Sequence, residues 1–245
     1  LYTQRCFRRK VGDLIEDSKN LNLNNSDQKN LIEMDREYKL ASAIPTELVE
    51  KISKSSAKCE GVWQEAREKS DFNLVKKDLE ELINLTKEEA NIVGETFKVS
   101  PYEALINKFE PSSEENKISE VFDDLQKFLT PLIDKIIDKQ KKEETFQFET
   151  SIDEEQQKNV SEYIMKQIGF DFTRGRLDKS VHPFCGGSTN DVRITTRYNN
   201  ENPFSSLDGV MHETGHALYE LNLPKDWMHQ PAGTARGMAM HESQS

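Results

Sequence analysis

The stretch SSLDGVMHETGHALYELNLP, residues 205–224, decides the interpretation of this chain. Its apolar periodicity predicts a helix that ends before Pro224. Inside it, the letters HETGH fit the pattern H-E-x-x-H, with His212 and His216 four residues apart. Residues at this spacing project from one face of a helix, so the two imidazoles can approach the same metal ion. The segment therefore predicts two ligands of a metal site.

Between the two histidines, Glu213 is turned by roughly 100° from His212 in a regular helix. Its carboxylate then flanks the ion instead of binding it, and it can accept a proton from water as a general base. Gly215 costs a helix about 1 kcal/mol relative to Ala, so we expect another backbone or a substrate to approach closely there. The motif also arises by chance, and an exposed helix with two aligned histidines is the alternative interpretation.

A catalytic zinc site keeps three protein ligands and one open position, so a third ligand has to be found. The downstream candidates are Glu220, Asp226, His229, His241 and Glu242. Glu220 lies on the same helix, two turns past His212, and reaches the ion poorly. Residues 232–245 predict a second helix with Glu242 on its apolar face. A carboxylate there is costly unless it is paired or bound, so Glu242 is either a ligand or half of a buried salt bridge to an arginine.

Composition limits the class of protein. The chain has 245 residues, with 33 Lys plus Arg against 44 Asp plus Glu and a formal net charge of −11. No run approaches 18 apolar residues, so we expect no membrane-spanning helix. An acidic chain without a basic block binds nucleic acid poorly. The three cysteines (Cys6, Cys59 and Cys185) are odd in number and far apart, which favours reduced thiols and a cytoplasmic location.

Glycines and histidines are concentrated in the last third of the chain, after a long part rich in Lys, Glu and Leu. Periodicity predicts helices near residues 26–44, 45–67, 74–93, 101–111, 119–144 and 153–168. Residues 191–198, DVRITTRY, alternate with a period of two and form the only persuasive strand. We therefore predict one mainly helical domain over residues 1–245, with a helical scaffold over 1–180 and a metal-site region over 181–245.

Four short motifs occur in a fixed order: HPF at 182–184, DVRIT at 191–195, HETGH at 212–216 and HESQ at 241–244. With the upstream segments WQEAREKSDF and SPYEALINKFEP, they resemble the carboxypeptidase Taq family of metallocarboxypeptidases. The resemblance covers essentially the whole chain. It implies a mainly α, multi-helix, zincin-like peptidase fold with a deep groove, similar to neurolysin, and with a small β element near the active site.

The resemblance also implies roles. His212, His216 and Glu242 are the ligands of one divalent metal ion, with zinc expected first and cobalt or manganese as alternatives. Glu213 is the general base of a metal-dependent carboxypeptidase that hydrolyses C-terminal residues from peptide substrates, and a homodimer is expected for the complete protein. Two alternatives stay open: a zinc endopeptidase or oligopeptidase with the same site, and a non-catalytic helical interaction protein with a vestigial metal site.

Members of this family are about twice as long as this chain, and two further motifs follow HESQ in them. We therefore expect a fragment that is truncated at both ends. The groups that bind the substrate's terminal carboxylate and stabilise the oxyanion are expected in the missing C-terminal half. Some helices should then expose apolar faces where that half would pack.

Three more side chains are candidates for substrate binding. His182 belongs to the HPF motif that the resemblance places at the substrate cleft. Arg193 lies on the predicted strand, which could act as an edge strand above the metal and pair with an extended peptide. Arg193 and Asp191 share one face of that strand, so an ion pair between them is the alternative. His241 adjoins Glu242 and could contact substrate, support the ligands, or simply pack.

Overall fold

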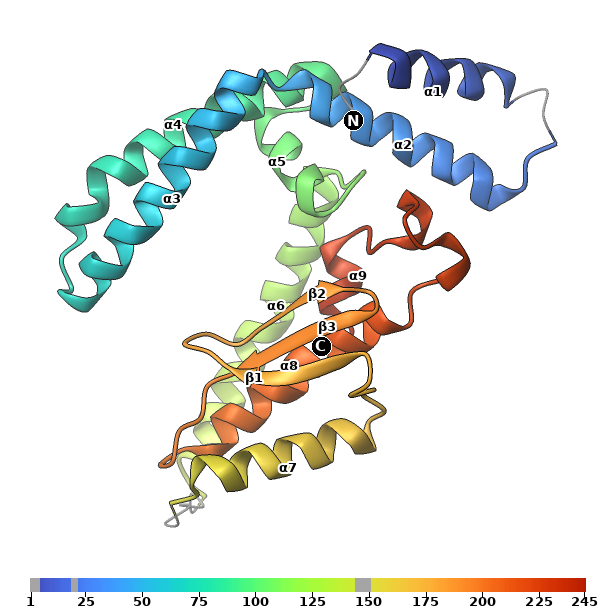
Figure 1. The fold of residues 1–245 in the computed structure, drawn as a ribbon. Coiled ribbons are helices and arrows are strands. Elements are labelled where there is room, and N and C mark those ends of the chain that lie inside the picture. The colour runs from blue at the N-terminus through green and yellow to red at the C-terminus, as the bar shows by residue number, and fades with distance from the viewer. Residues whose placement is uncertain (1–4, 19–21, 144–150) are drawn as a thin grey trace. The chain divides into compact units, whose positions relative to one another are not determined.

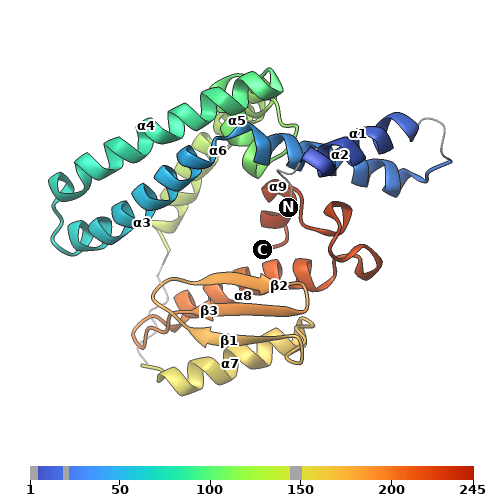
Figure 2. The ribbon, with the colours of Figure 1, turned by 45° about the horizontal axis from the view of Figure 1, so that its top comes forward.

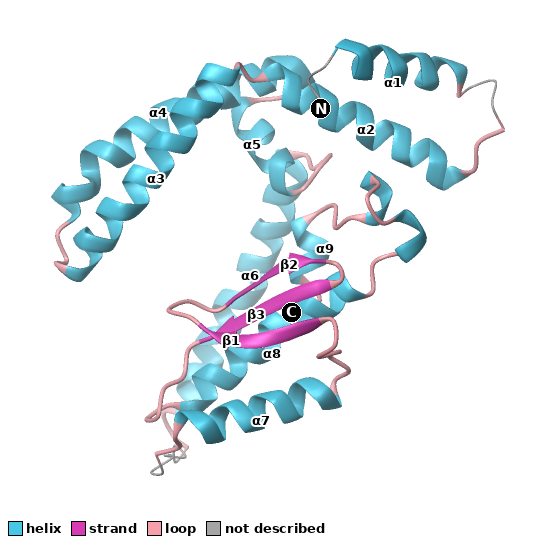
Figure 3. Ribbon diagram, viewed as in Figure 1, coloured by secondary structure: helices cyan, strands magenta, loops and turns pink. Residues whose placement is uncertain are grey.

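The computed structural model describes residues 5–18, 22–143 and 151–245 (Figure 1). Residues 1–4, on which the expected N-terminal truncation falls, lie outside these ranges. The described elements follow the chain in the order α1 (Arg5–Asp17), α2 (Asn25–Ala43), α3 (Thr46–Glu68), α4 (Phe72–Phe97), α5 (Pro101–Phe109), α6 (Glu115–Gln140), α7 (Glu154–Gln167), β1 (Gly175–Lys179), β2 (Phe184–Ser188), β3 (Asp191–Thr196), α8 (Pro203–Leu221), the 3-10 helices η1 (Lys225–Trp227) and η2 (Pro231–Gly233), and α9 (Met238–Glu242). The predicted mainly helical fold with a small β element is confirmed (Figure 3).

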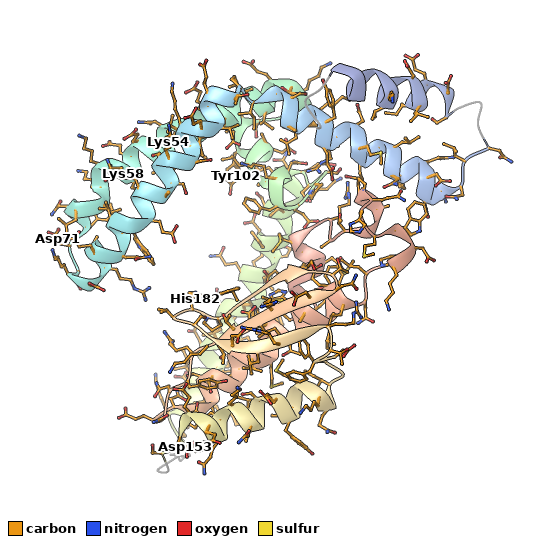
Figure 4. The ribbon with its side chains drawn as sticks, viewed as in Figure 1. Lys54, Lys58, Asp71, Tyr102, Asp153 and His182 are labelled. Carbon is orange, nitrogen blue, oxygen red and sulfur yellow. The ribbon has the colours of Figure 1, made fainter. Side chains whose placement is uncertain are left out.

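The chain forms two compact units, Leu1–Ile118 and Ser119–Ser245. In the first unit, α3 and α4 lie side by side as a helical hairpin. Its apolar seam is formed by Cys59, Ala66 and Val75, all of them buried. Lys58 of α3, marked in Figure 4, donates to Asp78 of α4 at 2.6 Å. The residues proposed for the metal site all belong to the second unit.

Helix α6 is continuous although Pro131, a residue that usually interrupts helices, lies inside it. Most of its apolar side chains are exposed, among them Val121, Phe122, Leu125 and Phe128. The expectation that some helices expose apolar faces is thus confirmed for α6.

Among the helices of the described ranges, none combines the length and apolar character needed to cross a bilayer.

The second unit contains a sheet with three strands in the order β1-β3-β2. β1 runs parallel to β3 and β2 runs antiparallel to it. The sequence predicted β3 and missed β1 and β2, because GRLDK is largely charged and FCGGS contains two glycines. β3 is the central strand, so the prediction that it acts as an edge strand is wrong. β2 forms an edge of this sheet instead.

A tight turn joins β2 to β3 and depends on Gly187. Its φ of +103° is a backbone conformation that residues with a Cβ rarely adopt. A Cβ at this position would also lie 2.1 Å from the carbonyl oxygen of Asp191. Glycine is therefore required here for the hairpin to close and for β2 to take its place at the edge of the sheet.

Helix α8 packs against β3 and β2, and α7 packs against α8 (Figure 2). The residues of the shared core are apolar and buried: Met165, Phe170, Leu177, Val192, Ile194, Val210, Ala217 and Leu221. A buried polar contact fixes the start of α8, where Ser206 Oγ donates to Gln157 Oε1 at 2.8 Å. At its other end, Arg174 Nη2 donates to the carbonyl of Leu221 at 3.1 Å. These contacts hold α8 in position along its whole length.

Candidate metal centre

The helix that carries the H-E-x-x-H motif is anchored by its apolar face. Val210 and Ala217 of α8 are fully buried against the sheet. A buried aliphatic side chain of the size of Val or Ile contributes about 1.5–3 kcal/mol, which exceeds the cost of about 1 kcal/mol for a glycine within the helix. Another face of α8 carries His212 and His216. The core therefore sets the direction in which both imidazoles point.

The structure brings the three predicted ligands together. His212 Nε2 and His216 Nε2 are 3.3 Å apart, and their rings meet edge to face. Glu242 Oε2 lies 3.5 Å from His216 Nε2. One ligand atom from each residue falls within 4.8 Å of the other two, and within the described ranges no other such cluster of His, Cys, Asp or Glu is found.

These separations fit a metal ion. Two donor atoms that each lie about 2.0–2.1 Å from a tetrahedral ion are about 3.3–3.4 Å apart. The two imidazole nitrogens meet this condition, and Glu242 Oε2 comes close to it in its distance to His216 Nε2, while the three donor atoms all lie within 4.8 Å of one another. Two nitrogens and one oxygen also leave a fourth tetrahedral position open. The donor set therefore suits an ion of the catalytic zinc type.

Glu242 reaches the histidines from α9, a helix of only five residues. The sequence predicted a longer helix with Glu242 on its apolar, buried face. That prediction is wrong, because the side chain of Glu242 is 52% exposed. The burial argument thus fails, and what distinguishes Glu242 is its proximity to His216.

Gly215 of α8 lies directly against the backbone of Gln244 and Ser245. A Cβ on Gly215 would lie 2.0 Å from the carbonyl oxygen of Gln244 and 2.6 Å from Cα of Ser245. The predicted close approach of another backbone at this glycine is confirmed. Since Gln244 follows Glu242 by two residues, the same contact sets how near the carboxylate comes to the histidines.

Glu213 is buried, with 8% of its surface exposed, on the helix turn between the two histidines. Cys185 of β2 packs against the core beside it. Burial, followed by the negative charges of Glu213 and Glu220, raises the pKa of the Cys185 thiol to about 12. A raised pKa favours the protonated thiol, which fits the packing of Cys185 against the core.

The three candidate substrate residues lie in different surroundings. His182 is exposed in the loop between β1 and β2 (Figure 4), where its Nδ1 lies 2.7 Å from the carbonyl of Pro183. Arg193 is exposed and donates to both carboxylate oxygens of Asp191, at 2.9 and 2.7 Å. This ion pair was the alternative interpretation of Arg193, and it lowers the pKa of Asp191. A substrate contact by His182 or Arg193 stays a prediction.

His241 is largely covered, and its surroundings contain a residue that the sequence interpretation missed. Its Nε2 lies 3.2 Å from Glu220 Oε1, and its ring stacks on that of His216. Glu220 was considered only as a poor ligand. The signal that could have found it is its position four residues beyond His216, on the same helix face.

Comparison with known proteins identifies the family. The family model described as carboxypeptidase Taq (M32) metallopeptidase matches residues 1–245. The chain belongs to the carboxypeptidase Taq family. It is 34% identical over 237 residues to thermostable carboxypeptidase 1 of Pyrococcus furiosus, and this match covers 95% of this chain and 47% of the relative. Carboxypeptidase 1 of Bacillus subtilis is 34% identical over 221 residues, with coverage of 89% and 44%.

Solved structures agree with this assignment to the carboxypeptidase Taq family. Metallocarboxypeptidase 1 of Trypanosoma cruzi matches with a TM-score of 0.92 and 36% identity, over 99% of this chain and 49% of the other. A Pyrococcus furiosus carboxypeptidase structure matches with a TM-score of 0.84 and 31% identity, over 99% and 48%. The chain thus spans about half the length of the relatives that it matches.

The contact at Gly215 leads to a test of the metal site. Gly215→Ala should stabilise an isolated helix by about 1 kcal/mol, yet its Cβ has to displace the backbone of Gln244. We expect zinc to bind at least tenfold more weakly in a chelator competition assay, while the helical circular dichroism signal is retained. Gly61→Ala in α3 is the matched control, because a Cβ there meets nothing within 4 Å. Unchanged zinc affinity in Gly215→Ala would contradict the role given to this contact.

Proposed function

We propose that the complete protein is a metal-dependent carboxypeptidase that hydrolyses C-terminal residues from peptides. One observation carries the proposal: the ligand atoms of His212, His216 and Glu242 converge in a chain of the carboxypeptidase Taq family. The names of the matched relatives, carboxypeptidase 1 and thermostable carboxypeptidase 1, support the same activity. The three converging residues are the proposed metal ligands.

Zinc is the proposed ion, with cobalt or manganese as alternatives, because two imidazoles and one carboxylate are a common catalytic zinc set. When bound, such an ion supplies Lewis-acid chemistry that acidifies water and polarises a carbonyl group. His212 and His216 hold the ion from α8, and Glu242 holds it from α9. The two neutral imidazoles and the single carboxylate would only partly neutralise a divalent cation, which keeps it a Lewis acid.

Glu213 is the proposed general base. Its carboxylate accepts a proton from the attacking water while the water oxygen bonds to the scissile carbonyl carbon. The same carboxyl group then gives the proton to the leaving amine as the carbon–nitrogen bond breaks. Its position between the two histidines on one helix turn supports this role, and its low exposure limits competition from bulk water.

Strand β2 supports a peptide as the substrate. It packs on α8 and, in the described part of the chain, it pairs with β3 on one side only. Its other edge therefore offers backbone N–H and C=O groups with which an extended peptide can pair. His182, two residues before β2, and Arg193, whose β3 position pairs with Gly186 of β2, are proposed to contact that peptide.

Two further proposals rest on the family resemblance and on cysteine usage. The complete protein is proposed to be a homodimer, as members of the family typically are. A cytoplasmic location is proposed because the cysteines suit reduced thiols. Cys59 and Cys185, the cysteines whose side chains the structure describes, are both free.

The role of Glu213 can be tested by Glu213→Gln in the complete protein. The amide keeps the size of the side chain but cannot accept a proton, so we expect kcat to fall about 10²- to 10⁴-fold. Zinc content, measured by atomic emission, should stay at one ion per chain. Glu201→Gln, at an exposed loop position, is the control and should keep full activity. Near-normal turnover by zinc-loaded Glu213→Gln would refute the assignment.

Exopeptidase activity can be tested with two peptides of one sequence, one with a free C-terminal carboxylate and one amidated. We expect release of single C-terminal residues from the free acid and at least 100-fold slower cleavage of the amide. A chelator should abolish the release, and added zinc or cobalt should restore it. Equal cleavage of both peptides at internal bonds indicates an endopeptidase. A complete protein that binds no metal and cleaves neither peptide would support a non-catalytic role.

A further inference from the structure

The surroundings of His241 separate it from substrate. Its Nε2 lies 3.2 Å from Glu220 Oε1, and a carboxylate can only accept, so the imidazole donates this hydrogen bond. Its Nδ1 is buried and has no partner among the described residues. The side chain as a whole is 15% exposed. Neither ring nitrogen of His241 is thus available to contact a substrate.

The ring of His241 is packed against α8 on two sides. It stacks on His216, with ring centroids 4.6 Å apart and planes 20° from parallel. The edge of the Tyr219 ring meets it at 4.9 Å and 90°. With the hydrogen bond to Glu220, three contacts join this one side chain of α9 to about one turn of α8. Glu242, the next residue, is carried with it.

The other ring nitrogen of His216 explains why the stack matters. A histidine that binds metal through one nitrogen usually donates from the other to a carboxylate or carbonyl, which fixes the plane of its ring. Nδ1 of His216 is buried and has no hydrogen-bond partner in the described part of the chain. The stacked ring of His241 is the contact that can fix the orientation of His216 in its place.

We propose that Glu220 and His241 form a positioning pair, which orients His216 and holds Glu242 at the distance required to bind the same ion. Glu220 holds the imidazole of His241 through a hydrogen bond, and this imidazole sets the plane of the His216 ring. Because Glu242 follows His241 in the chain, its position is fixed by the same contacts. The inference rests on the proposed metal site. It replaces the predicted substrate contact of His241 by a role that acts through the ligands.

The alternative role makes a different prediction for kinetics. A residue that binds substrate lowers KM or raises kcat without changing metal affinity, whereas a positioning pair acts first on metal affinity. Metal-supporting residues of this kind typically contribute 10- to 100-fold in affinity. The two residues also depend on each other, so their replacements should not add in a double-mutant cycle.

The test uses the complete protein and the variants Glu220→Ala, His241→Ala, their double variant and Glu220→Gln. The dissociation constant of zinc is measured by chelator competition, and the visible spectrum of the cobalt form reports ligand geometry. We expect each alanine variant to bind zinc 10- to 100-fold more weakly and to change the cobalt spectrum, with KM for peptide unchanged. The double variant should bind zinc no more weakly than the single alanine variant with the lower zinc affinity. Glu220→Gln keeps an acceptor oxygen and should restore affinity to within a few-fold.

Asp208→Ala is the matched control. Asp208 is also acidic and lies four residues before His212 on α8, as Glu220 lies four after His216, but it is exposed. The zinc affinity of Asp208→Ala should equal that of the unmodified protein. Alanine variants with unchanged zinc affinity overturn the proposal, whether or not KM rises. If the unmodified protein itself binds no zinc, the proposed function fails instead, so the two failures are distinguishable. Melting temperatures of the metal-free variants identify any that fail to fold.

Discussion

The contact between α9 and α8 is the constraint on which the candidate site depends. α8 is held by a buried core and can present two histidines without help. α9 has five residues, and isolated helices shorter than about 12 residues are marginal in water, so its position comes from tertiary contacts. Because Gly215 has no Cβ, the backbone of Gln244 can lie directly against α8, and the ring of His241 stacks on that of His216. Without these contacts, Glu242 would have no fixed relation to the two imidazoles.

A second requirement is that the sheet supports α8 without covering its ligand face. Ile194 and Val192 of β3 are buried against Val210 and Ala217, so the apolar side of α8 is directed to the sheet. The histidines consequently point elsewhere. Glu213 comes to lie at the boundary, where it is 8% exposed and close enough to raise the pKa of Cys185. One turn of α8 thus carries both side chains that pack in the core and side chains of the candidate metal site.

The three proposed ligands could be predicted from the sequence because their signal is local or shared with a family. His212 and His216 follow from helical spacing, and the long helices follow from periodicity. Three features escaped it for physical reasons. β1 and β2 are short and weak in β propensity, and exist because β3 pairs with them. The exposure of Glu242 depends on where α9 ends. The bond from His241 to Glu220 joins residues 21 apart, a contact that no local pattern encodes.

The most direct measurement is a crystal structure of the zinc-loaded complete protein, with anomalous diffraction collected on both sides of the zinc absorption edge. We expect one strong anomalous peak about 2.0–2.2 Å from His212 Nε2, His216 Nε2 and a carboxylate oxygen of Glu242. The ring of His241 should remain stacked on that of His216. A peak that lies elsewhere, or a Glu242 carboxylate turned away from both imidazoles, would contradict the proposed metal site.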